Sequence, residues 1–191
     1  MELILASQSP RRQEIMHAMR IPFTAEACTE PEHTVAGLSS EETVKQLAFQ
    51  KADFVLRKHP DACVIGADTI VDLDGEIIGK PRSGEDAVRT LTRMQGRSHV
   101  VYTGLAVLRR DYRDVRCVTT KVRFRPMTER EIRWYVSTGE PMDKAGSYGA
   151  QGYGSLFVDS IEGNYFNVIG LPAPVLYEML RNAGALPEDR V

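Results

Sequence analysis

The chain has 191 residues, of which 42% are hydrophobic and 26% charged, and its formal net charge is −2. These values are usual for a globular protein with enough apolar residues to form a core, in one domain or two closely packed lobes. A mildly acidic chain without a basic stripe does not favour a general nucleic-acid or membrane binder.

The three cysteines, Cys28, Cys63 and Cys117, form an odd and scattered set. Their spacing fits neither a disulfide framework nor a zinc site, which favours a reducing compartment. The apolar start is only a few residues long and carries Glu2. We therefore expect no signal peptide and no membrane span, and a cytoplasmic protein.

The first third of the chain alternates strand and helix signals. Ser9 is placed to cap a helix that has Pro10 at its first position. Ser39 and Glu42 form a capping box for a longer helix. The expected elements are a strand over 2–6, a helix from Pro10 to about Met19, a strand over 23–27, a loop over 28–38, a helix over 40–58 and a strand over 63–67.

The rest of the chain adds hairpins to this alternation. Asp74-Gly75 is typical of a two-residue hairpin turn, and Thr128 with Glu131 is a second capping box. The expected elements are a hairpin over 69–78, a helix over 83–94, strands over 99–108 and 116–125, a helix closed by Gly139, a glycine-rich loop over 146–154, a strand over 157–161 and a helix over 174–183. Because hairpins interrupt the alternation, the pattern predicts an α/β or α+β fold with a mixed sheet.

Two charged residues lie where apolar ones are expected. Lys51 falls in the middle of the apolar stripe of the helix over 40–58, so it must snorkel, pair with an acid or bind an anion. Asp68 is set into a strand of buried type and needs a cation, a metal or hydrogen bonds. Both a structural ion pair and a functional site satisfy these requirements.

The hairpin register proposes a partner for Asp68. If Asp74-Gly75 is the turn, Leu73 pairs with Glu76, and counting outward places Thr69 opposite Lys80. Asp68 would then be the diagonal neighbour of Lys80. A plain cross-strand salt bridge satisfies this geometry as well as a catalytic pair does.

The segment A-S-Q-S-P-R-R, residues 6–12, joins the first strand to the first helix. A helix N-terminus preceded by Ser7 and Ser9 offers free backbone N–H groups and the positive end of the dipole. Arg11 and Arg12 at this end oppose the dipole unless an anion binds there, and phosphate matches the guanidinium fork.

Lys51, Asp68 and Lys80 strengthen the phosphate interpretation, because each lies where solvation alone explains a charge poorly. From the residues alone, the sequence predicts an enzyme that handles polyphosphates with the help of a metal ion.

Several ordered motifs carry a resemblance to a known family. They are S-Q-S-P-R-R-Q-E (7–14), A-F-Q-K-A (48–52), G-A-D-T-I-V (66–71), G-K-P-R (79–82), Q-G-R-S-H-V-V-Y-T-G (95–104), Y-V-S-T-G-E-P-M-D-K-A-G-S-Y-G-A-Q-G (135–152) and F-N-V-I-G-L-P (166–172). With these motifs the chain resembles the Maf family of nucleotide pyrophosphatases nearly end to end.

The resemblance implies a single Maf-like domain over 1–191. Its fold would be α/β, with a mixed, elongated sheet flanked by helices in two lobes around a central cleft, related to inosine-triphosphate pyrophosphatases. The implied reaction is hydrolysis between the α and β phosphates of a nucleoside triphosphate, giving the monophosphate and pyrophosphate. A divalent cation, Mg²⁺ or Mn²⁺, would be required, and a homodimer is the assembly that the family suggests.

Three positions distinguish the branches of this family. The branch that acts on dTTP and UTP carries Arg, Thr and Gln at these positions. This chain resembles that branch, because it has Arg11, Thr69 and Gln151. The branch that prefers 7-methyl-GTP has Trp, Gln and Glu there. A glutamine amide can accept from N3–H and donate to O4 of uracil or thymine. A flipped amide could also meet cytosine, so Gln151 alone does not exclude CTP.

The resemblance also implies roles for individual residues. Asp68 would be the general base for the attacking water or a metal ligand that orients it. Glu32 would share the metal with Asp68, although a solvated loop acid explains Glu32 as well. The residues that would hold the triphosphate and stabilise developing charge are Ser7, Arg12, Lys51 and Lys80.

A second function belongs to a different class. Members of the resembling family are associated with inhibition of septum formation, so the chain could regulate cell division by binding a partner or a nucleotide. Lys51 and Asp68 within apolar elements favour the hydrolase, because a binding module does not need that arrangement. As a hydrolase, the protein would limit excess or modified pyrimidine nucleotides.

Overall fold

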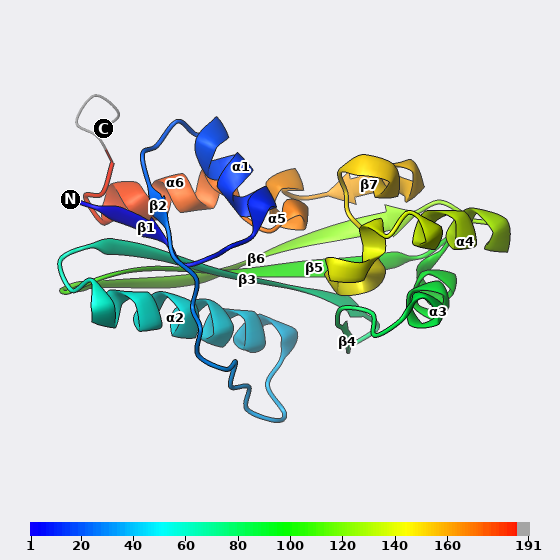
Figure 1. Ribbon diagram of the computed structural model, residues 1–191, viewed down its shortest axis with the longest axis horizontal. Coiled ribbons are helices and arrows are strands. Elements are labelled where there is room, and N and C mark those ends of the chain that lie inside the picture. Colours follow the sequence, from blue (N-terminus) through cyan, green and yellow to red (C-terminus); the bar gives the residue numbers. More distant parts are fainter. Residues whose placement is uncertain (187–191) are drawn as a thin grey trace. The chain divides into compact units, whose positions relative to one another are not determined.

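A computed structural model describes residues 1–186 (Figure 1). The chain divides into two compact units. The first unit contains Met1–Asp68, Thr103–Val118 and the described residues from Gly170 to 186, and the second contains Thr69–Tyr102 and Thr119–Ile169. The predicted placement of two lobes around one cleft stays a prediction.

The described strands form one mixed sheet, in the order β2-β1-β3-β5-β6-β7, with β4 paired to β3. β1 pairs in parallel with β2 and β3, whereas the β3–β4 and β6–β7 pairs are antiparallel. This mixture confirms the predicted α/β class with a mixed sheet. The strands are β1 (Leu3–Leu5), β2 (Thr24–Ala25), β3 (Cys63–Leu73), β4 (Glu76–Ile78), β5 (Ser98–Arg109), β6 (Tyr112–Phe124) and β7 (Val158–Glu162).

The first unit is built in layers. Its strands carry α2 (Ser40–Lys58) on one face, and α1 (Pro10–Ala18) and α6 (Ala173–Asn182) on the other (Figure 1). Small side chains dominate the layer between α2 and the strands, which lets helix and sheet approach closely. The buried cluster consists of Ile4, Ala6, Ala48, Ala52, Val55, Ala62, Val64, Ala106 and Leu108.

The N-terminus of α2 follows the predicted capping box. The Ser39 hydroxyl accepts from the Glu42 N–H, and the Glu42 carboxylate accepts from the Ser39 N–H. Acidic Glu41 and Glu42 lie in the first turn and basic Arg57 and Lys58 in the last, as the helix dipole favours. These local signals explain why the helix begins and ends where the sequence predicts.

Two glycines set how closely α2 lies on the sheet. A Cβ at Gly66 of β3 would lie 2.1 Å from the carbonyl oxygen of Ala48 and 2.9 Å from the backbone nitrogen of Ala52. A Cβ at Gly104 of β5 would lie 2.1 Å from the carbonyl oxygen of Val44. The backbone of α2 therefore rests directly on the backbone of two strands, and no larger residue fits at either position.

The cap of α1 differs from the prediction. Ser9 occupies the N-cap position, but its side chain makes no capping hydrogen bond. Instead the Ser7 hydroxyl accepts from the Ser9 N–H at 3.2 Å. The hydroxyl that binds a backbone N–H group at this junction therefore belongs to Ser7 and not to Ser9, the residue expected to cap the helix.

The second unit packs helices and short 3-10 turns against its strands. Its elements besides strands are α3 (Gly84–Met94), α4 (Glu129–Ser137), α5 (Tyr165–Ile169), η1 (Glu140–Asp143), η2 (Ala145–Ser147) and η3 (Gly152–Phe157). α3 and α4 pack against each other. The buried cluster consists of Val71, Leu73, Ile78, Val88, Leu91, Met94, Val101, Val122, Phe124, Met127, Ile132, Tyr135, Tyr148 and Phe157.

The β3–β4 hairpin has the predicted turn and register near its tip. Asp74 and Gly75 both have positive φ, 57° and 86°, and Leu73 pairs with Glu76. The ladder ends at Val71–Ile78, however, so the predicted pairing of Thr69 with Lys80 is wrong.

The cause of this early ending lies in the backbone of Gly79. Its carbonyl accepts from the N–H of Gly146 at 3.2 Å, so the chain after β4 pairs with the glycine-rich segment instead of β3. The prediction that Asp68 and Lys80 are diagonal neighbours required the β3–β4 pairing to continue to Thr69 and Lys80. Because the pairing ends earlier, this prediction is wrong as well.

Three rings form the polar centre of the second unit. His99, Phe124 and Tyr148 meet edge to face, with centroids 4.7–5.2 Å apart. The His99 Nε2 and the Tyr148 hydroxyl are 2.7 Å apart and share a hydrogen bond. Burial lowers the pKa of His99 to about 4, so the ring is neutral at physiological pH.

Within residues 1–186, no helix combines the length and the apolar character needed to cross a membrane.

The Gly66 contact leads to a stability prediction. Gly66→Ala should lower the free energy of unfolding by at least roughly 1–3 kcal/mol, because the methyl group must push α2 away from β3. Gly79→Ala is the matched control, since open space surrounds its Cβ position. Urea denaturation of both variants checks this, and equal stability of the two would contradict the close approach.

The buried His99 predicts a pH dependence of stability. The unfolded chain protonates this ring near pH 6.5 and the folded chain only near 4, so the unfolded state binds more protons between these values. Stability is therefore full above pH 6.5 and falls as the pH drops toward 4, by on the order of 3 kcal/mol from this group.

His99→Gln keeps a polar partner for Tyr148 but removes the titration. Denaturation from pH 7 to 4 should give a shallower loss of stability for the variant than for the unmodified protein. Parallel curves for the two proteins would show that His99 does not carry this pH dependence.

Candidate active site

Lys51 and Asp68 form an ion pair inside the first unit. Asp68 lies two residues after Gly66 on β3, so both face α2, because side chains of a strand alternate between its faces. Lys51 stands between Ala48 and Ala52, the residues that touch Gly66. The Lys51 Nζ to Asp68 Oδ1 distance is 2.5 Å, and the two side chains are 16% and 12% exposed.

Of the three alternatives for Lys51, the structure shows the pairing with an acid. The cation found on Asp68 is thus Lys51, and Lys80 belongs to the second unit. Burial on both sides makes this pair costly to break, because removal of one partner leaves an uncompensated charge in an apolar layer.

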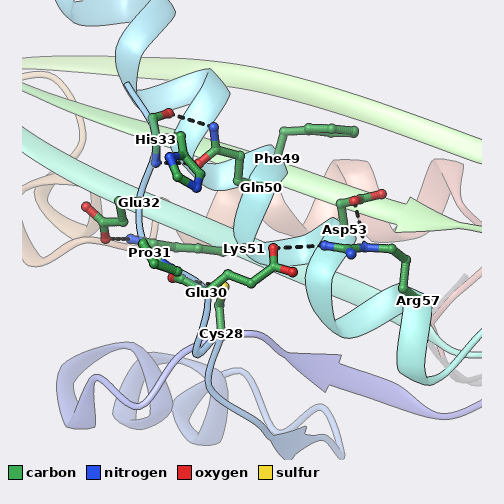
Figure 2. Close-up of a pocket in the computed structure, with 10 residues that line it drawn as sticks. All are labelled: Cys28, Glu30, Pro31, Glu32, His33, Phe49, Gln50, Lys51, Asp53 and Arg57. Carbon is green, nitrogen blue, oxygen red and sulfur yellow. Dashed lines mark hydrogen bonds and ion pairs between the residues drawn. The ribbon is translucent and has the colours of Figure 1, made fainter. Parts of the chain in front are cut away.

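Glu32 is the second carboxylate on the same ammonium group. Its Oε1 lies 2.9 Å from the Lys51 Nζ, and its side chain is 58% exposed (Figure 2). Lys51 therefore joins a buried carboxylate from β3 to an exposed carboxylate from the loop that follows β2. Two acids that are 36 positions apart in the sequence converge on one cation.

The loop that carries Glu32 is fastened to α2 on both sides of it. Gln50 donates to the His33 carbonyl at 2.7 Å and accepts from the His33 N–H at 3.2 Å. Arg57 pairs with Glu30 at 2.9 Å (Figure 2). These contacts hold Glu32 over Lys51 although the loop has no regular structure of its own.

A cavity of about 150 Å³ lies beside the Lys51–Glu32 ion pair. Its walls come from the loop and from α2, and Figure 2 shows Lys51 and Glu32 meeting among the side chains that line it. Its lining is Cys28, Glu30, Pro31, Glu32, His33, Phe49, Gln50, Lys51, Asp53 and Arg57.

Arg12 is held at the junction of β1 and α1. Its Nε donates to the Gly170 carbonyl at 2.8 Å and its Nη1 to the Ser7 hydroxyl at 3.3 Å. Burial lowers the pKa of Arg12, and Arg11 adds to this lowering, whereas Asp68 and Glu32 oppose it. An arginine remains protonated despite such a shift, so Arg12 is a fixed cation that feels both carboxylates.

The two carboxylates also decide whether a metal ion fits. Within residues 1–186, no group of three or more His, Cys, Asp or Glu side chains is close enough to hold a metal by itself. Glu32 and Asp68 nevertheless converge within hydrogen-bond distance of a single cation. Mg²⁺ in phosphate enzymes commonly takes one or two carboxylates and completes its shell with water and phosphate oxygens. The donor set therefore fits such an ion.

The other predicted site residues belong to the second unit, except Arg11. Thr69 follows Asp68 on β3 and is half-buried, whereas Lys80 and Gln151 are exposed. Arg11 is half-buried in the first turn of α1. The structure thus brings together Ser7, Arg12, Lys51, Asp68 and Glu32 within the first unit, and the roles assigned to all nine residues stay predictions.

Sequence patterns gave no signal for the residues that fasten Glu32. Gln50 and Arg57 look like ordinary solvated positions on an amphipathic helix. Their contacts depend on where an irregular loop returns to α2, and no periodicity encodes that return.

A double-mutant cycle tests the buried pair. Lys51→Met and Asp68→Asn should each destabilise the protein, and their coupling free energy should lie in the upper part of the range of about 0.5–3 kcal/mol. The cycle of Lys45→Met with Glu41→Gln on the same helix is the control, because that pair is exposed. Equal coupling in the two cycles, measured by urea denaturation, would contradict a special role for the buried pair.

Comparison with known proteins identifies the family of the chain. A family model described as Maf-like protein matches residues 2–183. The chain is 49% identical over 170 residues to the dTTP/UTP pyrophosphatase of Bacillus velezensis, covering 89% of this chain and 90% of the relative. It is 48% identical over 183 residues to the dTTP/UTP pyrophosphatase of Symbiobacterium thermophilum, with coverages of 96% and 94%.

Among solved structures, the chain is similar to the Ham1 protein of Staphylococcus aureus, with a TM-score of 0.48 and 16% identity, covering 100% of this chain and 93% of that one. The family model spans nearly the whole sequence, and the motifs at 7–14, 48–52 and 66–71 contain the residues that meet in the first unit. The chain belongs to the family of Maf-like proteins.

Proposed function

We propose that this protein is a nucleoside triphosphate pyrophosphatase that hydrolyses dTTP and UTP to the nucleoside monophosphate and pyrophosphate. The observation that carries the proposal is the Lys51 ammonium group between a buried and an exposed carboxylate, Asp68 and Glu32. The two relatives at 48% and 49% identity, both named dTTP/UTP pyrophosphatase, support the substrate.

In this proposal Asp68 acts on the attacking water, either as a metal ligand that orients it or as its general base. In the base route, Lys51 takes the Oδ1 atom, and the carboxylate keeps Oδ2 as a proton acceptor. A new bond forms between the water oxygen and the α-phosphorus, the bond to the bridging oxygen of the β-phosphate breaks, and the water proton goes to Asp68. Pyrophosphate leaves with the bridging oxygen, and the monophosphate remains.

The cations have a separate task. Arg12 and Lys51 hold phosphate oxygens and stabilise the charge that develops as the bond breaks, and Lys80 is proposed to do the same. The Ser7 hydroxyl orients Arg12 and offers a polar contact to phosphate. Fixed donors of this kind cost no reorganisation during the reaction, which is the main source of catalysis in phosphoryl transfer.

Asp68 and Glu32 would hold Mg²⁺ or Mn²⁺. When bound, the ion neutralises phosphate charge and polarises the oxygen it coordinates. If Asp68 acts as a metal ligand instead of as the general base, Lys51 and Arg12 would keep their positive charge for the substrate.

Base selection is proposed for Gln151, with Arg11 and Thr69. An amide oriented with its oxygen toward N3–H and its nitrogen toward O4 matches uracil and thymine by two hydrogen bonds. A site built for both bonds discriminates against a base that leaves one of them unmade, because a desolvated polar group is then unpaired.

The other expectations from the family resemblance stay predictions. They are a role in cell division, a homodimer, a cytoplasmic location and a physiological task in removing excess or modified pyrimidine nucleotides.

A nucleotide panel tests the proposed reaction. The purified protein is assayed with dTTP, UTP, CTP, ATP and GTP in Mg²⁺ or Mn²⁺, and pyrophosphate and orthophosphate are measured separately. We expect pyrophosphate and monophosphate from dTTP and UTP. Asp68→Asn should fold and lose on the order of 10²-fold or more in kcat. Asp61→Asn is the matched control, because this aspartate is 86% exposed and pairs with Arg110.

Three outcomes would contradict the proposal. Orthophosphate as the first product would place the cleaved bond elsewhere in the triphosphate. Near-normal turnover of Asp68→Asn would remove this residue from the mechanism. No turnover with any nucleotide or metal would favour the regulatory role.

A further inference from the structure

The loop over 149–154, which carries Gln151, is fastened to one carboxylate. Glu140 accepts from the Gly154 N–H with Oε1 and from the Tyr153 N–H with Oε2, both at 2.9 Å. These two amides lie directly after Gln151 and Gly152 in the chain. A carboxylate that accepts adjacent backbone N–H groups forms charge-assisted bonds, which are stronger than neutral ones.

Tyr135 extends the same anchor to the other end of the loop. Its hydroxyl donates to Glu140 Oε1 at 2.9 Å and accepts from the Gly149 N–H at 3.2 Å. Gly149 and Gly154 are thus tied to one phenol–carboxylate pair. The segment between them has both ends fixed, with Gln151 near its middle.

Packing and hydrogen bonds hold both residues of this anchor. Tyr135 is fully buried on α4 and its ring packs edge to face on Phe157 at 5.0 Å. Burial raises the pKa of Tyr135, and Glu140 adds to this effect, so the hydroxyl stays protonated and remains a donor. Glu140 is held through its own backbone, since its N–H donates to Thr138 and its carbonyl accepts from Lys144.

Glycines let the loop wrap closely around this pair. A Cβ at Gly152 would lie 2.6 Å from Glu140 Oε2, and φ there is +67°. A Cβ at Gly154 would lie 2.7 Å from the Tyr135 hydroxyl and 2.2 Å from the Gly149 carbonyl oxygen. Side chains at these positions would push the loop off its anchor, so the glycines and the carboxylate serve the same geometry.

The Gln151 side chain takes no part in these contacts. It is exposed, and among the described residues its amide makes no hydrogen bond, so the bonds act on the backbone around it. From this arrangement we propose that Glu140, supported by Tyr135, is a positioning residue that sets the selection of the nucleobase by fixing the backbone of Gln151. The inference rests on the proposed function, because it assigns Gln151 to base recognition.

A purely structural role for Glu140 makes a different prediction. If its bonds only stabilise the second unit, their loss lowers stability and leaves the ratio of rates among nucleotides unchanged. If they position Gln151, their loss changes that ratio, because an amide displaced from its two-bond geometry no longer favours uracil and thymine.

The experiment compares four variants of the full chain. Glu140→Gln replaces one acceptor oxygen by an NH₂ group that faces a backbone or hydroxyl donor. Tyr135→Phe keeps the ring packing and removes the hydroxyl that links Glu140 to Gly149. Gln151→Ala is the benchmark for complete loss of base recognition.

Glu131→Gln is the matched control. Glu131 is also a carboxylate that accepts a backbone N–H, that of Thr128, but its hydrogen bonds go to the N-cap of α4 and to Arg125, and not to residues 149–154. It should lower thermal stability without changing selection among nucleotides.

The readout is kcat/KM for UTP divided by kcat/KM for CTP, together with melting temperatures. We expect Glu140→Gln and Tyr135→Phe each to reduce this ratio, by roughly tenfold for Glu140→Gln, mainly through KM for UTP. The reduction should approach that of Gln151→Ala, and Glu131→Gln should keep the ratio of the unmodified protein.

An unchanged ratio in folded Glu140→Gln, or in Tyr135→Phe if the first variant does not fold, would overturn the inference. It would leave the proposed function intact, because the unmodified protein still turns over its substrates. Absence of turnover in the unmodified protein would overturn the proposed function, and this inference with it.

Discussion

The close approach of α2 to the sheet is the constraint on which the first unit depends. The absence of a Cβ at Gly66 and Gly104 lets backbone rest on backbone, and this sets how far any side chain of α2 can be from β3. Lys51 and Asp68 stand beside that contact, so a long flexible ammonium meets a short carboxylate in a layer of alanines. A helix raised by one methyl group would separate the pair or open the layer to water.

Four charged side chains around this contact are two basic and two acidic residues. Lys51 and Arg12 stand against Asp68 and Glu32, and Arg12 feels both acids. A triphosphate carries several negative charges, so a balanced cluster gains little by binding it unless something else takes up the carboxylates. The proposed divalent cation would do this, since it would leave both basic residues to the phosphates. Charge balance and proposed metal dependence are in this way two aspects of one arrangement.

What could be predicted from the sequence depended on how local the signal was. The capping boxes at Ser39 and Thr128 fixed the starts of α2 and α4, because a cap involves residues three positions apart. The pattern around Lys51 showed that something must compensate it, but left three alternatives, and the hairpin argument favoured Lys80 as the partner of Asp68. That argument failed because the Gly79 carbonyl accepts a hydrogen bond from the Gly146 N–H. This contact joins residues 67 positions apart, and no sequence periodicity predicts it.

The irregular segments carry the groups that strand and helix signals could not place. Glu32 owes its position to Gln50 and Arg57 on α2, and the loop around Gln151 owes its shape to Glu140. In both, a side chain of a helix or 3-10 turn binds the backbone or the neighbours of the loop residue. The Glu32 carboxylate is then paired with Lys51, whereas the Gln151 amide stays exposed. An ordered loop loses little conformational entropy when a substrate binds, so more of the contact energy is available for affinity and discrimination. The irregular parts of this chain are therefore as specifically built as its helices, by means that appear only in three dimensions.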